Sequence, residues 1–116
     1  MAQLALLIDD VVVQVFPLDK SSVTIGRLPK CDICIDDESV SSVHALIKIT
    51  PNELLDGHDD VVIYDLQSTN GVVVNDRKVE RCQLNPNDVV AIGWNCFKFF
   101  DEQSQGRETT VLMMLD

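Results

Sequence analysis

The chain has 116 residues with a formal net charge of −10, and 46% of its residues are apolar and 24% charged. This length and composition are ordinary for a single soluble globular domain. An acidic surface repels nucleic-acid phosphates and anionic membranes, so we expect neither as a partner. The sequence has no apolar stretch long enough to span a bilayer and no signal-peptide pattern, so we expect a cytoplasmic protein.

Apolar residues recur with a period of two along most of the chain, which predicts β-strands. Turn-forming residues separate the strand-like runs, and no helical pattern of ten or more residues is present. Many short, β-branched strands with regular turns predict an all-β sandwich, and we assign residues 1–100 to one domain. In chain order, the predicted strand segments are residues 11–18, 21–27, 31–37, 44–50, 60–66, 71–75, 78–84, 88–94 and 96–100.

Residues 101–116 differ in composition from the domain. A polar stretch, "EQSQG", is followed by "RETTVLMMLD", which ends in an apolar run. This pattern predicts a C-terminal tail or an extra strand that packs on the sandwich or pairs across a dimer.

The four cysteines raise the question of a metal or redox site. Cys31 and Cys34 have C-x-x-C spacing, but Cys82 and Cys96 do not form a second close pair. We therefore interpret all four as free thiols and predict neither a metal site nor a cofactor.

Three short motifs carry polar side chains at the ends of predicted strands. Gly26 and Arg27 end one strand, and arginine offers a planar fork of donors that suits a phosphate. Thr69, Asn70 and Gly71 form a tight turn between two apolar segments, which by itself indicates only a hairpin.

The third motif, Ser41-Ser42-x-His44, admits two interpretations. A Ser/His nucleophile would need a third group to orient the ring and an oxyanion hole. The surrounding "DDESVSSVH" is acidic and has no glycine, which disfavours an anionic transition state. A loop hydroxyl that holds a ligand, beside a buried histidine that braces the loop, is the favoured interpretation. We therefore predict no catalytic residue and no enzyme activity.

The order and spacing of these motifs, together with "TIGR", "DICID", "VSSVHALI", "YDLQSTNGVVVN" and "NDVVAIG", resemble the forkhead-associated (FHA) domain family over about residues 4–100. The resemblance implies an FHA-type (SMAD/FHA-like) β-sandwich of about eleven strands, with binding loops at one end. It also implies a module that binds phosphothreonine peptides in Ser/Thr kinase signalling. By position, the implied phosphopeptide-binding residues are Arg27, Ser41, Ser42, Thr69 and Asn70, and the implied loop-shaping residues are Gly26, His44, Gly71 and Asn75.

One position departs from the family pattern. Ser42 stands where many members have a longer donor, and the acidic run at 36–38 lies beside it. Lys30, Arg77, Lys78 and Arg81 are candidates for a basic rim. The alternative function is a phosphate-independent scaffold, or a domain that self-associates through its apolar tail into a homo-oligomer.

The tail carries a second expectation. Thr109 and Thr110 follow Glu108, and some small bacterial FHA regulators resemble this in carrying a Glu-Thr-Thr segment that a kinase phosphorylates. Such a segment could occupy the domain's own site or that of a neighbour.

Overall fold

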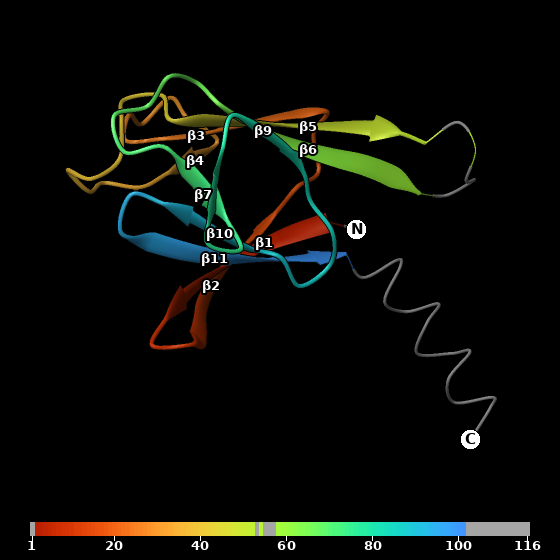
Figure 1. Ribbon diagram of the computed structural model, residues 1–116, viewed down its shortest axis with the longest axis horizontal. Helices are drawn as coiled ribbons and strands as arrows, with labels where there is room; N and C mark the ends of the chain where they lie inside the picture. Colours follow the sequence, from red (N-terminus) through yellow and green to blue (C-terminus); the bar gives the residue numbers. More distant parts are fainter. Residues whose placement is uncertain (1, 53, 55–57, 102–116) are drawn as a thin grey trace.

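The computed structural model describes residues 2–52, 54 and 58–101, and it shows two β-sheets packed face to face (Figure 1). This confirms the predicted all-β sandwich of about eleven strands. Within the described part of the chain, no helix is long and apolar enough to cross a membrane. The strands are β1 (Ala2–Ile8), β2 (Val11–Pro17), β3 (Ser22–Gly26), β4 (Ile33–Cys34), β5 (Ala45–Pro51), β6 (Asp59–Asp65), β7 (Val72–Val74), β8 (Arg77–Val79), β9 (Arg81–Gln83), β10 (Val89–Ile92) and β11 (Asn95–Asp101).

The first sheet has the strand order β2-β1-β11-β10-β7-β8, and the second has the order β4-β3-β5-β6-β9. Alternate residues of each strand point between the sheets and form the core, as the period of two requires. The largest fully buried side chains include Leu4, Ile25, Ile47, Ile63 and Phe97. Because these apolar residues fill the core, most polar side chains lie at the strand ends and in the loops.

Two features of the strand pattern were not predicted from the residues. The first strand, β1, was missed because Leu4 and Ala5 are both buried, so the apolar run there shows no alternation. The predicted segment 78–84 is two strands. β8 pairs with β7 in the first sheet, whereas β9 pairs with β6 in the second. A continuous alternating pattern cannot show that the chain changes sheet at Glu80.

Tight turns connect the hairpins of the first sheet. Asp9 and Asp10 join β1 to β2, and Asn75 and Asp76 join β7 to β8, each with positive φ values between 49° and 69°. Two successive left-handed residues are typical of the type I′ turn, whose twist matches that of the flanking strands. Register is therefore set locally at these two hairpins.

The loops that carry the sequence motifs lie together at one end of the sandwich, on the left in Figure 1. Strand pairing places them there, because Ile25 pairs with Ala45, and Ala45 pairs in turn with Asp65. The other end holds the start of β1 and the end of β11, where Ala2 pairs with Asp101. Apart from Asp101, the predicted tail lies outside the described residues.

Candidate functional site

Backbone hydrogen bonds join the three motif-bearing loops into one surface. The Arg27 N–H donates to the Ser41 carbonyl (3.0 Å), and the Leu28 N–H donates to the Ser42 carbonyl (3.2 Å). The Thr69 N–H donates to the Ser41 hydroxyl oxygen (3.0 Å). Three segments that are distant in the sequence therefore meet at Ser41.

His44 is the buried centre of this arrangement. Its side chain is fully buried, its Nδ1 accepts the Ser41 N–H (3.0 Å), and its Nε2 lies 2.8 Å from the Gly71 carbonyl oxygen. A carbonyl can only accept, so Nε2 carries the proton and Nδ1 the lone pair. Both ring nitrogens are thus occupied by backbone groups. The ring holds the loop of Ser41 against that of Gly71, and it has no lone pair to take a proton from the Ser41 hydroxyl.

The hydroxyl of Ser41 is oriented for donation. Ser41 is half-buried, and its oxygen already accepts the Thr69 N–H, so the hydroxyl proton is left for an acceptor outside the protein. Thr69 and Asn70 are exposed beside it. The Asn70 side-chain N–H donates to the Ser39 carbonyl (2.8 Å), which holds the carboxamide in place and leaves its oxygen for a ligand N–H.

Ser68 and Asp65 shape the turn that presents Thr69 and Asn70. The Ser68 N–H and hydroxyl both donate to one Asp65 carboxylate oxygen, at 3.0 and 2.6 Å. The Ser68 oxygen then accepts the Gly71 N–H (2.9 Å). Gly71 has φ = +79°, a conformation that favours glycine. Sequence reasoning gave Ser68 no role, although the Asp-x-x-Ser spacing is typical of such side-chain-capped turns.

Arg27 is exposed, and one side of its guanidinium group is fixed by a hydrogen bond. Its Nε–H donates to the Val40 carbonyl (3.1 Å), so one of five guanidinium donors is used and the terminal N–H groups remain for a ligand. Gly26 allows this close approach of loops. A Cβ at residue 26 would lie 2.4 Å from the Ser42 carbonyl oxygen and 2.9 Å from Val43 Cα.

The C-x-x-C pair lies behind these loops. The buried Cys31 thiol donates to the Ser42 carbonyl, and the Cys34 thiol to the Arg27 carbonyl, each at 3.5 Å. All four cysteines are free thiols, and Cys34 and Cys96 are exposed. Among the described residues, no group of three or more His, Cys, Asp or Glu side chains is placed to hold a metal ion.

A second network, centred on Ser39, supports the loop before Ser41. The buried Ser39 hydroxyl donates to Asp37 (2.9 Å) and accepts the Trp94 N–H (3.0 Å). Asn95 also donates to Asp37 (2.9 Å). The Ser39 N–H, which also donates to Asp37 (3.1 Å), lowers the pKa of Asp37 from its usual value, and the Ser39 hydroxyl and Asn95 add to this effect. Sequence reasoning treated the acidic run at 36–38 as a repulsive patch, yet the Asp37 carboxylate is engaged within the loop.

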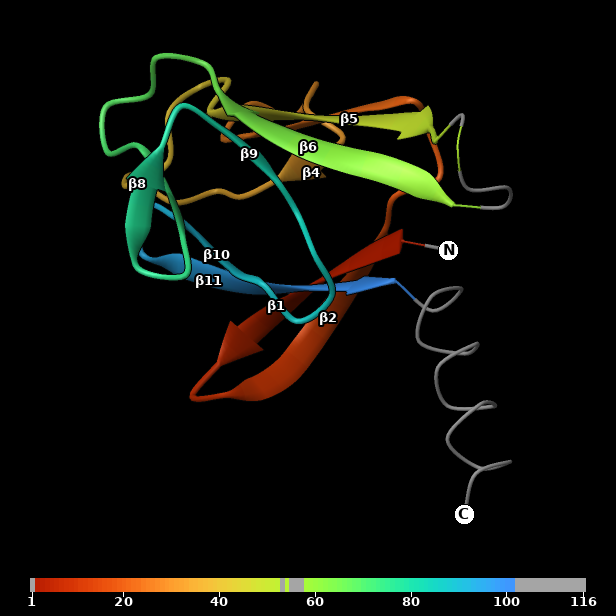
Figure 2. The same cartoon turned by 45° about the vertical axis from the view of Figure 1, so that its right-hand side comes forward.

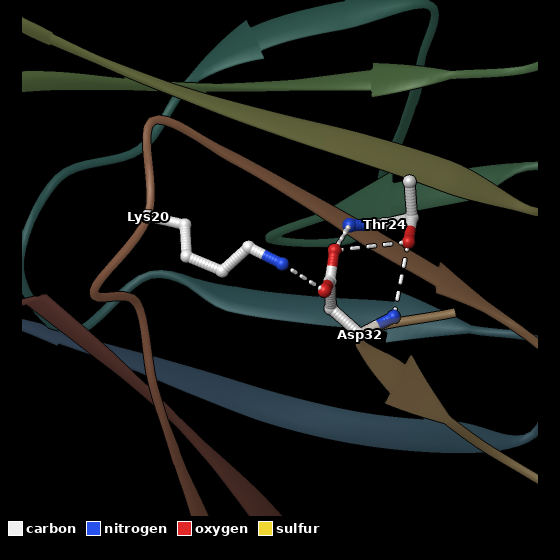
Figure 3. A network of polar contacts seen from close by, with 3 residues as sticks. All are labelled: Lys20, Thr24 and Asp32. Atoms are coloured by element: carbon white, nitrogen blue, oxygen red, sulfur yellow. Dashed lines mark hydrogen bonds and ion pairs between the residues drawn. The ribbon is translucent and has the colours of Figure 1, made fainter. Parts of the chain in front are cut away.

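A polar contact beside β3, just before β4, anchors the loop that follows Arg27 (Figure 3). Asp32 accepts the Thr24 N–H (2.9 Å) and the Lys20 ammonium, and its own N–H donates to the Thr24 hydroxyl (3.0 Å). The hydrogen bond from Lys20, followed by that from the Thr24 N–H, lowers the pKa of Asp32 from 3.8 to about 2. The loop between β3 and β4 is thereby held back onto β3.

The predicted basic rim is only partly assembled. The Lys78 side chain crosses Gly71, because its Cε lies 2.5 Å from the position of a Cβ at residue 71. Arg77 lies at the other end of β7, and Arg81 lies over the Tyr64 ring at 5.9 Å. Lys30 is exposed in the loop between β3 and β4. Lys78 therefore lies beside the turn of Thr69 and Asn70.

Two further predicted positions are resolved differently. Ser42 is exposed, and its carbonyl accepts hydrogen bonds from the Leu28 N–H and the Cys31 thiol. Its small side chain is therefore exposed to solvent.

Asn75 is not part of the loop cluster. It lies at the far end of β7, where it accepts the Val89 N–H and donates to Asp88, both at 2.9 Å. The predicted phosphorylation positions Thr109 and Thr110 lie outside the described residues.

Comparisons with known proteins agree with this geometry. A family model for the FHA domain matches residues 23–93. The glycogen accumulation regulator GarA of Mycobacterium tuberculosis is 33% identical over 93 residues, which cover 80% of this chain and 53% of GarA. The chain thus spans about half the length of this curated relative.

Solved structures match over a larger share of their length. The crystal structure of the FHA domain of the CT664 protein from Chlamydia trachomatis has a TM-score of 0.74 and 33% identity, covering 86% of this chain and 96% of that one. A structure from an analysis of phosphothreonine-dependent FHA domain interactions has a TM-score of 0.72 and 30% identity, covering 86% and 95%.

Proposed function

This chain belongs to the forkhead-associated (FHA) domain family, and from that premise we propose that it binds phosphothreonine in a partner protein and acts as a binding module, not as an enzyme. One observation carries the proposal: the Ser41 hydroxyl is held by the Thr69 N–H, beside an exposed Arg27 whose terminal N–H groups are unused within the described structure. This combination of a loop hydroxyl and a guanidinium suits a phosphate ester.

The donors match the chemistry of a phosphorylated threonine. Its phosphate carries a charge of about −1.5 to −2 and three strong acceptor oxygens. Arg27, Ser41 and the Thr69 hydroxyl offer donors to these oxygens, and a hydrogen bond to a charged group contributes about 1.5–3 kcal/mol. Four such bonds would give roughly 6–12 kcal/mol before the cost of association. Since association costs at least about 4 kcal/mol, these bonds alone leave at most about 8 kcal/mol, which corresponds to a dissociation constant no tighter than about micromolar.

Asn70 supplies a different kind of contact. Its side-chain N–H is engaged with the Ser39 carbonyl, so its oxygen can accept a backbone N–H of the bound peptide. We assign to Asn70 the role of holding the peptide next to the phosphothreonine. The domain then binds two features of the partner, the phosphate of the phosphothreonine and the extended peptide backbone beside it.

The partner class follows from the ligand. A phosphothreonine is made by a Ser/Thr kinase, so we place the protein in such a pathway, and we propose that it acts in the cytoplasm. With a net charge of −10, the protein must rely on a local cationic spot, and at physiological salt charges beyond about 8 Å are largely screened. The phosphate-independent scaffold has less support, because the predicted phosphate donors are assembled at one surface.

The test is calorimetric titration of the full chain with a phosphothreonine peptide library and its unphosphorylated counterparts. We expect affinity for phosphorylated peptides only, and equal affinity for both forms would overturn the proposal. Arg27→Ala should weaken binding by about 2–5 kcal/mol if the guanidinium pairs with a buried phosphate. The matched control is Arg77→Ala at the far end of β7, which should bind as the wild type does.

A further inference from the structure

Strand β2 presents an unusually apolar free edge. Among the described strands, it is the outermost of the first sheet and pairs only with β1. Val11, Val12, Val13 and Val15 are 61%, 46%, 51% and 46% exposed. Figure 2 shows that the hairpin of β1 and β2 extends away from the second sheet, which leaves β2 uncovered by the rest of the described fold.

This edge lacks most of the protection that edge strands usually carry. Natural proteins blunt free edges with charged residues, internal prolines, bulges or very short strands. The β2 sequence VVVQVFP has seven residues, no charge, and its only proline at the end. The register shift between Leu6 and Leu7 leaves one residue of β2, Val13, without a partner in β1, so the strand carries a single bulge. The unpaired N–H and C=O groups of β2 are therefore available to another strand.

We propose that residues 109–115 of this chain, TTVLMML, add to the free edge of β2 as a further strand. Both β11 and β2 run antiparallel to β1, so their last residues lie at the same edge of the sheet. There, Asp101 pairs with Ala2 and Pro17 pairs with Gln3. A tail that turns back after Asp101 runs antiparallel to β2. This is the orientation that a short connection permits.

The connecting segment is long enough for this path. A strand beyond β2 lies three strand positions from β11, which is roughly 14–15 Å at 4.7–4.9 Å for each position. Residues 102–108 can span roughly 23–25 Å when extended. The segment can therefore pass the ends of β1 and β2 and still leave 109–115 to pair.

The composition of the segment suits the surface. Val12 and Val15 pair with Leu7 and Ala5, so they lie on the outer face of the hairpin, and Val11 continues the apolar edge at its tip. A partner strand must then be apolar on the face that it shares with Val12 and Val15. Residues 111–115, VLMML, meet this requirement because every position is apolar. Pairing would also hold Thr109 and Thr110 near Pro17, at the end of the molecule opposite to Ser41.

Hydrogen exchange of the full chain tests the proposal. The amides of 11–16 that face away from β1 should exchange about ten-fold or more slowly in the wild type than in a Leu112→Lys, Met114→Lys double variant, because pairing protects them. Equal exchange in the two proteins would overturn the proposal. The control is Leu54→Lys, whose side chain is 91% exposed in another loop, and which should exchange as the wild type does.

Two further measurements distinguish other occupants. If protection of 11–16 rises with protein concentration and sedimentation shows a doubled mass, a second copy covers the edge and the proposal is overturned. Val13→Pro should abolish the protection of residues 111–115, since a proline cannot continue the pairing. Phosphopeptide affinity should be unchanged in the double variant, so failure here is separate from failure of the proposed function.

Discussion

The backbone N–H of Ser41 donates to Nδ1 of His44 at 3.0 Å, so the histidine holds the serine through its main chain and not through its hydroxyl. The serine hydroxyl is instead positioned by the Thr69 N–H. A Ser/His pair in which the ring supports the loop and the hydroxyl faces a different group is suited to ligand binding.

Replacing His44 by phenylalanine should destabilise the domain and weaken ligand binding. The change fills a similar volume but leaves the Ser41 N–H and the Gly71 carbonyl without their partner. Each buried group left unsatisfied costs about 1–3 kcal/mol in the free energy of unfolding. Urea denaturation measures this loss, and a wild-type midpoint in the variant would contradict the bracing role.

Gly26→Ala should lower the free energy of unfolding by about 1–3 kcal/mol, the usual cost of overpacking. The added methyl group would meet the Ser42 carbonyl oxygen at 2.4 Å and the Cys31 sulfur at 2.8 Å, so the loops must separate. Phosphopeptide affinity should fall with stability. Ser42→Ala is the matched control, because it leaves that carbonyl in place, and it should retain wild-type stability in the same denaturation experiment.

Ser42→Arg should strengthen phosphopeptide binding by about ten-fold, or 1.4 kcal/mol. The exposed Ser42 lies next to Ser41, and an arginine there would add charge-assisted donors to the phosphate. The gain should shrink as salt rises, since exposed charges are screened. Titrations at two salt concentrations check both points. Ser22→Arg, exposed at the start of β3, is the control and should leave affinity unchanged.

Lys78→Glu should weaken phosphopeptide binding several-fold, mainly through slower association. The Lys78 side chain crosses Gly71, next to Asn70, so a carboxylate there would repel an approaching phosphate. Stopped-flow association rates would show the effect. Lys48→Glu is the matched control, because it reverses the same charge at a residue that lies over the Tyr64 ring in the second sheet. If both variants slow association equally, only net charge matters and Lys78 has no local role.

The Asp32 contact predicts a defined pH dependence of stability. Its pKa is lowered from 3.8 to about 2, so the folded state favours the carboxylate. The stabilisation is complete above about pH 5 and is lost as the pH falls from about 4 to 2. Asp32→Asn should therefore lower the urea midpoint at pH 7, and the difference from the wild type should be much smaller at pH 2 and vanish below it. A difference that persists unchanged at pH 2 would contradict this account.

Much of the fold could be predicted from local patterns. The alternation of Val23 and Ile25, or of Ala45 and Ile47, follows from one buried and one exposed face, so the strands and the sandwich were predictable. β1 was not predicted because Ala5 is buried on the outer face, so buried and exposed residues do not alternate there. The division of 78–84 between two sheets was not predicted because the strand with which a segment pairs does not depend on its local sequence.

The candidate site was predicted only at the level of residue types and order. Arg27, Ser41, Thr69 and Asn70 were identified because their motifs stand at strand ends in an order that resembles a known family. Gly26, His44 and Gly71 were identified as loop-shaping residues in the same way, but Ser39 and Asp65 were not assigned a supporting role. Ser39 serves both Trp94 and Asn70, and nothing in its local sequence distinguishes it from an ordinary loop serine.

The sequence by itself determined the strand-rich core, the motifs that belong to the FHA family, and the acidic charge that forces any phosphate site to be local. Only the tertiary structure decided which groups hold Ser41, which tautomer His44 adopts, and that Lys78 crosses Gly71. The reason is physical. Alternation depends on neighbours along the chain, whereas hydrogen bonds among three loops depend on strand pairing that brings distant residues together.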